Sequence, residues 1–126
     1  MAKYKSGELQ TVQYTAGADI TVDDVVVLGG VDAKKCTVGV AMDTIANGDT
    51  GAVAVSGVFE FAKVSTAVIL AGQAVNWDSS VPGVEDNAHT TGAGDVGEFG
   101  RAMEDAGNGT TTILVDISEP GTYDAA

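Results

Sequence analysis

The stretch GAVAVSGVFEF, residues 51–61, indicates the fold class more clearly than any other part of the chain. Its large apolar residues occupy alternate positions, namely Val53, Val55, Phe59 and Phe61. A period of two is typical of a β-strand with one buried face. Gly57 also falls on the apolar face, where a glycine is typical of a bulge or a sheet corner. We therefore expect a long strand that bends at Gly57 and serves two sides of a sheet.

The same alternation recurs on both sides of this stretch. One face of residues 110–117 carries Thr111, Ile113, Val115 and Ile117, and one face of residues 36–42 carries Cys36, Val38, Val40 and Met42. Clusters of Gly, Asn and Asp separate the apolar segments about every eight to twelve residues, which is typical of a β-sandwich or barrel. The sequence predicts an all-β fold, a small β-barrel or sandwich, with residues 110–117 as its last strand. We expect an exposed loop or small hairpin over residues 78–95, which are mostly polar.

A single domain accounts for the length of the chain. At 126 residues, of which 44% are hydrophobic, the chain is large enough for one core. Residues 1–7 show no periodicity, so we expect them to form an extended N-terminal arm. We assign residues 8–118 to the β-barrel domain and residues 119–126 to a C-terminal tail.

The charge of the chain excludes several classes of partner. Six Lys and Arg residues against 18 Asp and Glu residues give a net charge of −12, which is repelled by phosphate backbones and by anionic membranes. No apolar run is long enough to span a bilayer, and residues 1–10 contain no apolar stretch that could act as a signal peptide or anchor. We therefore expect synthesis in the cytoplasm, with no nucleic acid and no membrane as a partner.

The tripeptide Asp49-Thr50-Gly51 is the one that aspartic proteases carry. Their catalysis needs two carboxylates that share one proton at a dimer axis, on buried loops that follow apolar strands. Here Asn47-Gly48 precedes the tripeptide, and this dipeptide predicts a hairpin turn that leads into the next strand. We prefer the turn and keep a dimeric aspartic protease built on Asp49 as an alternative function.

The other reactive side chains are isolated in the sequence. His89 is the single histidine and lies in a polar segment without a second ligand nearby. Cys36 is the single cysteine and falls on an apolar strand face, where an inert core residue is expected. The carboxylates lie near turns and lack the spacing of a calcium loop. We expect no metal, no cofactor and no catalytic residue, and we place Trp77 in the core.

A set of segments in a fixed order resembles a known family. The segments are Gly29-Gly30, Val38-Gly39-Val40-Ala41, Asn47-Gly48-Asp49, residues 53–60 with Lys63 shortly after, residues 72–78, Gly97, Gly100-Arg101-Ala102 and residues 111–115. In this order they resemble the phage capsid cement proteins, also called head decoration proteins, over nearly the whole chain. The chain differs from the shorter members by its long segment 78–95 and its C-terminal tail.

The resemblance implies a small β-barrel protein on the exterior of the mature phage head. It implies binding to the major capsid protein as a homotrimer, with the N-terminal arm reaching a neighbouring subunit. A charge of −12 agrees with an outer position, because DNA fills the interior of the head. Positive charges and an aromatic ring suit the contacts of an otherwise acidic protein, so the expected capsid contacts are Lys3, Tyr4, Lys5 and Lys63.

A third function, besides decoration and proteolysis, is a ligand-binding β module of a virion. Such a module would bind glycans in a pocket and would not bind capsids. The sequence lacks the clustered aromatic residues that such pockets use, so head decoration remains the preferred prediction.

Overall fold

The structure is a computed structural model that describes residues 2–29, 35–88, 90–118 and 121–123. Within these ranges the chain forms β-strands and no helix, which confirms the predicted all-β class. The strands are β1 (Ala2–Ser6), β2 (Thr11–Thr15), β3 (Val25–Gly29), β4 (Lys35–Ala41), β5 (Thr50–Ala54), β6 (Val58–Ala62), β7 (Ala74–Asp78), β8 (Gly83–Asp86), β9 (Val96–Ala102), β10 (Thr112–Asp116) and β11 (Gly121–Tyr123). Across the described ranges, no segment forms a helix of the length and apolarity needed to cross a membrane.

The strands pair in one antiparallel path that branches twice. The path runs β1-β6-β10-β9-β11-β4-β5-β2, while β3 pairs with β4, and β7 pairs with both β9 and β8. Strands β1 and β2 therefore lie at the two ends of the path. The barrel is not closed, and the architecture is sandwich-like, so the second of the two predicted β-architectures is the correct one. Strands β7 and β8 form a hairpin over residues 74–86, so only its turn and β8 lie in the segment 78–95, where an exposed loop or small hairpin was expected.

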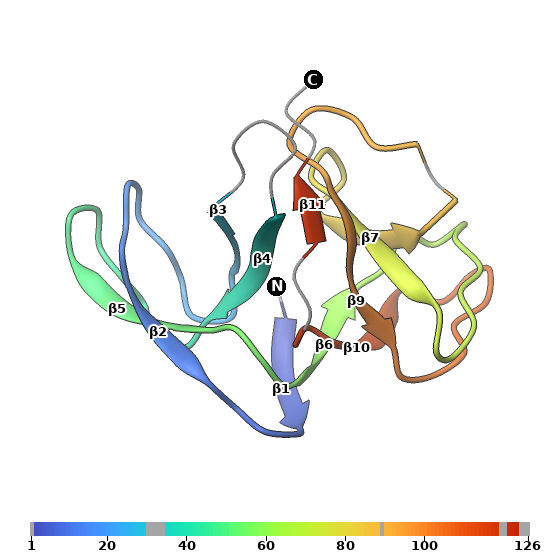
Figure 1. Cartoon of the computed structure of the whole chain (residues 1–126), viewed down its shortest axis with the longest axis horizontal. Coiled ribbons are helices and arrows are strands. Elements are labelled where there is room, and N and C mark those ends of the chain that lie inside the picture. The colour runs from blue at the N-terminus through green and yellow to red at the C-terminus, as the bar shows by residue number, and fades with distance from the viewer. Residues whose placement is uncertain (1, 30–34, 89, 119–120, 124–126) are drawn as a thin grey trace.

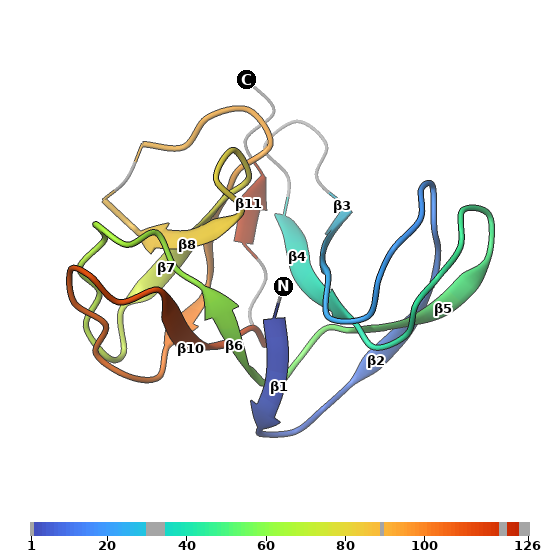
Figure 2. The same cartoon turned by 180° about the vertical axis from the view of Figure 1, so that it is seen from behind.

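Two lobes lie on either side of the centre of the molecule (Figures 1 and 2). We call strands β2–β5 the minor lobe and strands β1 and β6–β10 the major lobe. In both views β2 and β5 extend to one side, and β6–β10 gather on the other side. Strand β11 joins the lobes, because it pairs with β4 on one edge and with β9 on the other.

Two apolar cores lie on opposite faces of β4. Val38 and Val40 belong to the core of the major lobe, and Ala41 belongs to the core of the minor lobe. This division follows from the alternation of side chains along a strand. The side chains of β3 alternate in the same way. Val25 and Val27 pack against the major core, Val26 belongs to the minor core and Leu28 packs against it.

The major core is built around aromatic rings. The ring of Phe61 lies 5.5 Å from that of Phe99, 6.2 Å from that of Trp77 and 6.5 Å from that of Phe59, all edge to face. Edge-to-face pairs at these distances add to the stabilisation from burial alone. Trp77 is buried, as predicted. The minor core is aliphatic and much smaller, and its buried members are Ala16, Val26, Ala41, Ile45 and Val53.

The chain crosses between the lobes at Gly57. The stretch from residue 51 to residue 61 was expected as one bent strand, but it forms two strands, β5 and β6, which pair with different neighbours. Gly57 has a φ of +116°, a conformation that side chains with a Cβ atom rarely adopt. The predicted change of direction is therefore at the predicted residue, although it separates two strands instead of bending one.

Both ends of the described chain belong to the sheet. Residues 2–6, expected as an extended arm, pair with β6 as strand β1, and Ala2 is fully buried. Residues 121–123 of the expected tail form β11, so the strand at residues 112–116 is not the last one. Paired strands therefore stand on the outer side of both expected boundaries, after residues 7 and 118.

Candidate docking surface

Three of the four predicted contact residues, Lys3, Tyr4 and Lys5, stand on the edge strand β1. Lys3 lies opposite Glu60 of β6, and a shift of register between Tyr4 and Ser6 places Lys5 at a bulge. Both lysines are exposed. Within the described ranges, neither ammonium group makes a hydrogen bond or an ion pair. The structure thus places two unpaired positive charges close together at one end of the sheet.

Tyr4 supports the strand that carries these lysines. Its ring packs edge to face on Phe59, with the centroids 5.6 Å apart, and its hydroxyl donates a hydrogen bond of 2.7 Å to the Gly7 carbonyl oxygen. The side chain nevertheless remains 41% exposed. Tyr4 therefore anchors β1 to the major core and presents the rest of its ring to solvent.

The chain after β1 exposes further apolar side chains that sequence reasoning did not single out. Leu9, between β1 and β2, is 39% exposed, and Val12, on β2, is 43% exposed. Their local signal in the sequence is weak, since each is a single apolar residue among polar ones. We call Lys3, Tyr4, Lys5, Leu9 and Val12 the N-terminal surface. It follows the chain from β1 in the major lobe to β2 in the minor lobe (Figure 2).

Lys63, the fourth predicted contact, lies elsewhere and is only 5% exposed. Its Nζ atom donates hydrogen bonds to the carbonyl oxygens of Val64 (2.8 Å) and Thr110 (3.2 Å). Burial lowers the pKa of this ammonium group, and the negative charge of Glu85 opposes part of that shift. The structure therefore gives Lys63 a role inside the major lobe, and it does not bring this residue to the N-terminal surface.

Asp49 lies on the predicted turn. Its backbone N–H donates to the carbonyl oxygen of Ala46 (2.9 Å), which closes a β-turn, and Gly48 within this turn has a φ of +89°. The side chain of Asp49 is exposed. An aspartic protease holds its carboxylate in a buried loop where it shares a proton with a second one, and this exposed turn provides no such setting.

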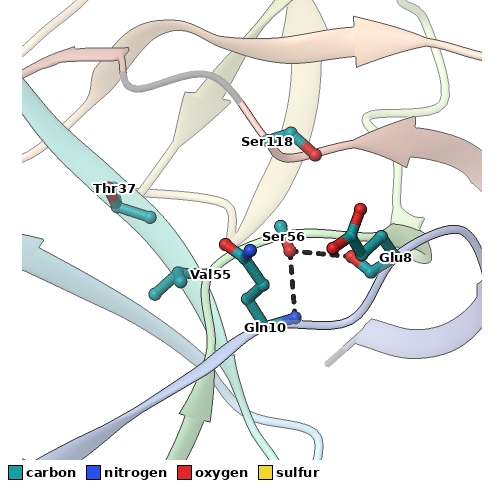
Figure 3. Close-up of a pocket in the computed structure, with 6 residues that line it drawn as sticks. All are labelled: Glu8, Gln10, Thr37, Val55, Ser56 and Ser118. Carbon is teal, nitrogen blue, oxygen red and sulfur yellow. Dashed lines mark hydrogen bonds between the residues drawn. The ribbon is translucent and has the colours of Figure 1, made fainter.

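A polar pocket of about 370 Å³ lies beside the crossing between the lobes (Figure 3). Its lining consists of Glu8, Gln10, Thr37, Val55, Ser56 and Ser118. The Ser56 hydroxyl donates to the Glu8 carbonyl oxygen (2.7 Å) and accepts from the Gln10 N–H (3.0 Å). These bonds fix the chain between β1 and β2, so they hold the N-terminal surface in place. The lining has no aromatic side chain on which a sugar ring could stack.

Two of the reactive residues fall outside what the structure describes. His89 lies outside the described residues, and the side chain of Cys36 is not described, although its backbone belongs to β4. Among the side chains that are described, no three His, Cys, Asp or Glu residues gather into a group that could hold a metal ion.

The comparison with protein families identifies the chain. A family model described as phage cement protein matches residues 4–117. No curated protein matches the chain. Because the matched range covers most of the sequence, the chain belongs to the phage cement protein family, as its resemblance predicted. The family is one of structural proteins, and its name indicates a role associated with the phage capsid.

Proposed function

We propose that this protein decorates phage heads: it binds the exterior of the mature capsid through the N-terminal surface and stabilises the capsid lattice. The observation that carries the proposal is the concentration of two unpaired cations and three exposed apolar side chains within residues 3–12 of a chain with a net charge of −12. Aromatic and apolar anchors flanked by charges are typical of protein interfaces. Few other parts of this acidic chain offer positive charge to a partner.

The proposed partner is the major capsid protein, and the proposed bound form is a homotrimer. The net charge supports an exterior position, since the same charge would be repelled by packaged DNA. Binding to the mature lattice and not to its precursor would shift the equilibrium between them toward the mature form. This role needs no catalytic group, so we propose that the protein is not an enzyme.

The proposal is tested with phage heads that lack this protein and with purified full-length chain. We expect the wild-type protein to co-sediment with the heads and to raise the temperature at which they break open. The double variant Lys3→Gln, Lys5→Gln removes both unpaired charges without removing Tyr4 from Phe59. Its affinity should fall roughly tenfold at low salt, because each exposed ion pair contributes at most about 1 kcal/mol.

The control is Arg101→Gln, which removes one exposed positive charge from β9, where the guanidinium donates a hydrogen bond to the Gly72 carbonyl oxygen (3.2 Å), and it is compared with the single variants Lys3→Gln and Lys5→Gln. The control should bind nearly as well as the wild type. Equal loss in the control and in single lysine variants would point to net charge alone and would contradict a specific surface. Deletion of residues 1–7 is a poorer test than these substitutions, because β1 also covers Phe59 and Phe61.

A further inference from the structure

Strand β2 is a regular edge that carries no charged side chain. Its sequence is TVQYT, residues 11–15, and it pairs with β5 through five consecutive residues without a bulge. Thr11, Val12, Gln13 and Thr15 are exposed, and Tyr14 is half-buried, so neither face of the strand is well covered. In Figure 1, β2 and β5 extend away from the rest of the molecule.

Every second residue of β2 directs its backbone away from β5. The Gln10 carbonyl oxygen accepts from the Val55 N–H (2.8 Å), and the Ala16 N–H donates to the Asp49 carbonyl oxygen (2.9 Å). Residues 10 and 16 thus both face β5, and antiparallel ladders alternate residue by residue. The N–H and C=O groups of Thr11, Gln13 and Thr15 therefore point outward, where another strand could pair with them.

The opposite end of the sheet is built differently. Strand β1 carries Lys3 and Lys5 and has a bulge between Tyr4 and Ser6. Edge lysines and bulges are the devices by which soluble proteins prevent unwanted pairing at an edge. Strand β2 has neither device, although it belongs to the same chain. An unprotected edge of this kind fits recognition by addition of a strand from a partner.

The charge around β2 limits what that strand can be. The described side chains of residues 8–28 and 37–55 include the acidic Glu8, Asp19, Asp23, Asp24, Asp43 and Asp49 and no Lys or Arg. A second copy paired through its own β2 would bring two acidic lobes together, which is unfavourable. A segment with positive charge would be attracted instead.

We infer that β2 is a strand-docking edge that takes an extended, net-positive segment of the capsid surface. This inference rests on the proposed function and adds to it a second contact, in the minor lobe, made by backbone hydrogen bonds. The N-terminal surface leads to this edge, since Val12 belongs to both. The two contacts would hold the protein to the capsid from both lobes.

The test uses the full-length protein and the same phage heads as above. Gln13→Pro removes the outward N–H group at the centre of β2, while the bonds of residues 10 and 16 to the β5 side remain. The control Gln13→Thr keeps the N–H group and suits a strand. We expect Gln13→Pro to lower the affinity for heads by about tenfold and Gln13→Thr to change it less than about twofold.

The charge of the docked segment is tested at the same position. Gln13→Lys should weaken binding and Gln13→Glu should strengthen it, and the reverse order would overturn the assignment of a positive partner. Amide exchange supplies a measurement that needs no variant. In wild-type protein bound to heads, the amides of Thr11, Gln13 and Thr15 should exchange at least about tenfold more slowly than in free protein.

The outcomes separate this inference from the proposed function. If wild-type protein binds heads while these three amides exchange as fast as in free protein, the docking edge is wrong and decoration stands. If wild-type protein does not bind heads, decoration fails and the inference fails with it. If Gln13→Pro abolishes self-association and leaves head binding unchanged, the strand comes from a second copy and the inference is wrong.

Discussion

The two lobes of this protein are built from the same kind of strand but are stabilised to different degrees. The major lobe encloses a core in which Phe61 contacts three other aromatic rings. The minor lobe encloses five buried aliphatic residues, and β2 contributes none of them. Because hydrophobic stabilisation scales with the apolar area removed from water, most of the folding free energy belongs to the major lobe.

This difference in stability suits the two lobes to different roles in binding. A rigid lobe holds β1 and its lysines in a fixed geometry, whereas a thin lobe leaves strand edges and backbone groups accessible. Ligand-binding segments are commonly drawn from the less stable parts of proteins, which fits the β2 edge, whereas the β1 lysines depend on the stability of the major lobe. The following predictions test whether the two lobes differ in this way.

The largest effect is expected from Phe61→Ala. Phe61 is fully buried at the centre of the aromatic cluster, so its removal leaves a cavity among rings that cannot easily close in. The free energy of unfolding should fall by about 4 kcal/mol. Urea denaturation followed by fluorescence of Trp77, which the cluster contains, measures this change.

The control for the comparison is Ile45→Ala in the minor lobe. Ile45 is also buried, but its core is small and lies near exposed strands that can collapse around the gap. The free energy of unfolding should fall by about 2 kcal/mol, near the lower end of the range for truncation of a buried isoleucine to alanine. Equal costs for the two variants would contradict the difference between the lobes.

A smaller effect is expected from Gly57→Ala at the crossing between the lobes. An alanine at this position would have to adopt a φ of +116°. Its Cβ atom would lie 3.3 Å from Cε1 of Tyr4 and 3.4 Å from Cε1 of Phe59. We expect a loss of about 2 kcal/mol in the free energy of unfolding, measured in urea. The control Gly107→Ala, with no atom within 4 Å of its Cβ, should change stability by less than about 0.5 kcal/mol.

The sequence predicted the strands of the major lobe where its period of two is unbroken. Ile113, Val115 and Ile117 are buried on one face, as expected. The same period of two would place Met103 on the side of Phe99, but Met103 is 51% exposed whereas Phe99 is buried. Phe99 and Gly100 are both buried, so the alternation shifts between them. Gly100 permits this shift because it has no Cβ atom. A Cβ atom at this position would lie 2.5 Å from the Asp116 carbonyl oxygen.

Other features depend on contacts between distant residues and have no local signal. Strand β11 has only three residues, and it forms because β4 and β9 offer edges on both sides. Lys63 was expected at the surface, since a lysine is rarely buried without a partner. Its burial follows from carbonyl groups at Val64 and Thr110, and the second of these lies 47 residues away in sequence.

The candidate surface was predictable only in part. The positive charges of Lys3 and Lys5 stand out in an acidic sequence, and composition alone could indicate them. The exposure of Leu9 and Val12 could not be predicted, because alternation does not say whether a face is covered by another element. The unpaired edge of β2 depends on the order of strands in the sheet, which a period of two leaves open.

The smallest effect concerns the buried cation of the major lobe and is confined to alkaline solution. The pKa of Lys63 is lowered in the folded protein by burial, so between that value and 10.5 the unfolded chain binds more protons than the folded one. In this window the stability of the wild type should rise with pH relative to Lys63→Met. The gain is about 1.4 kcal/mol for each unit by which folding lowers the pKa.

The measurement is urea denaturation of both proteins from pH 7 to pH 11, with the difference between them plotted against pH. The variant Glu85→Gln sharpens the result, because it removes the charge that raises the pKa of Lys63. The free energy of unfolding of this variant should begin to rise at a lower pH than that of the wild type, and the total rise should be larger. A difference that stays flat would mean that the Lys63 ammonium is as well solvated as in the unfolded chain, and the major lobe would then be as open at this point as the minor lobe is along β2. A difference that falls with pH would mean that folding raises the pKa of Lys63, because the attraction of Glu85 would then outweigh burial.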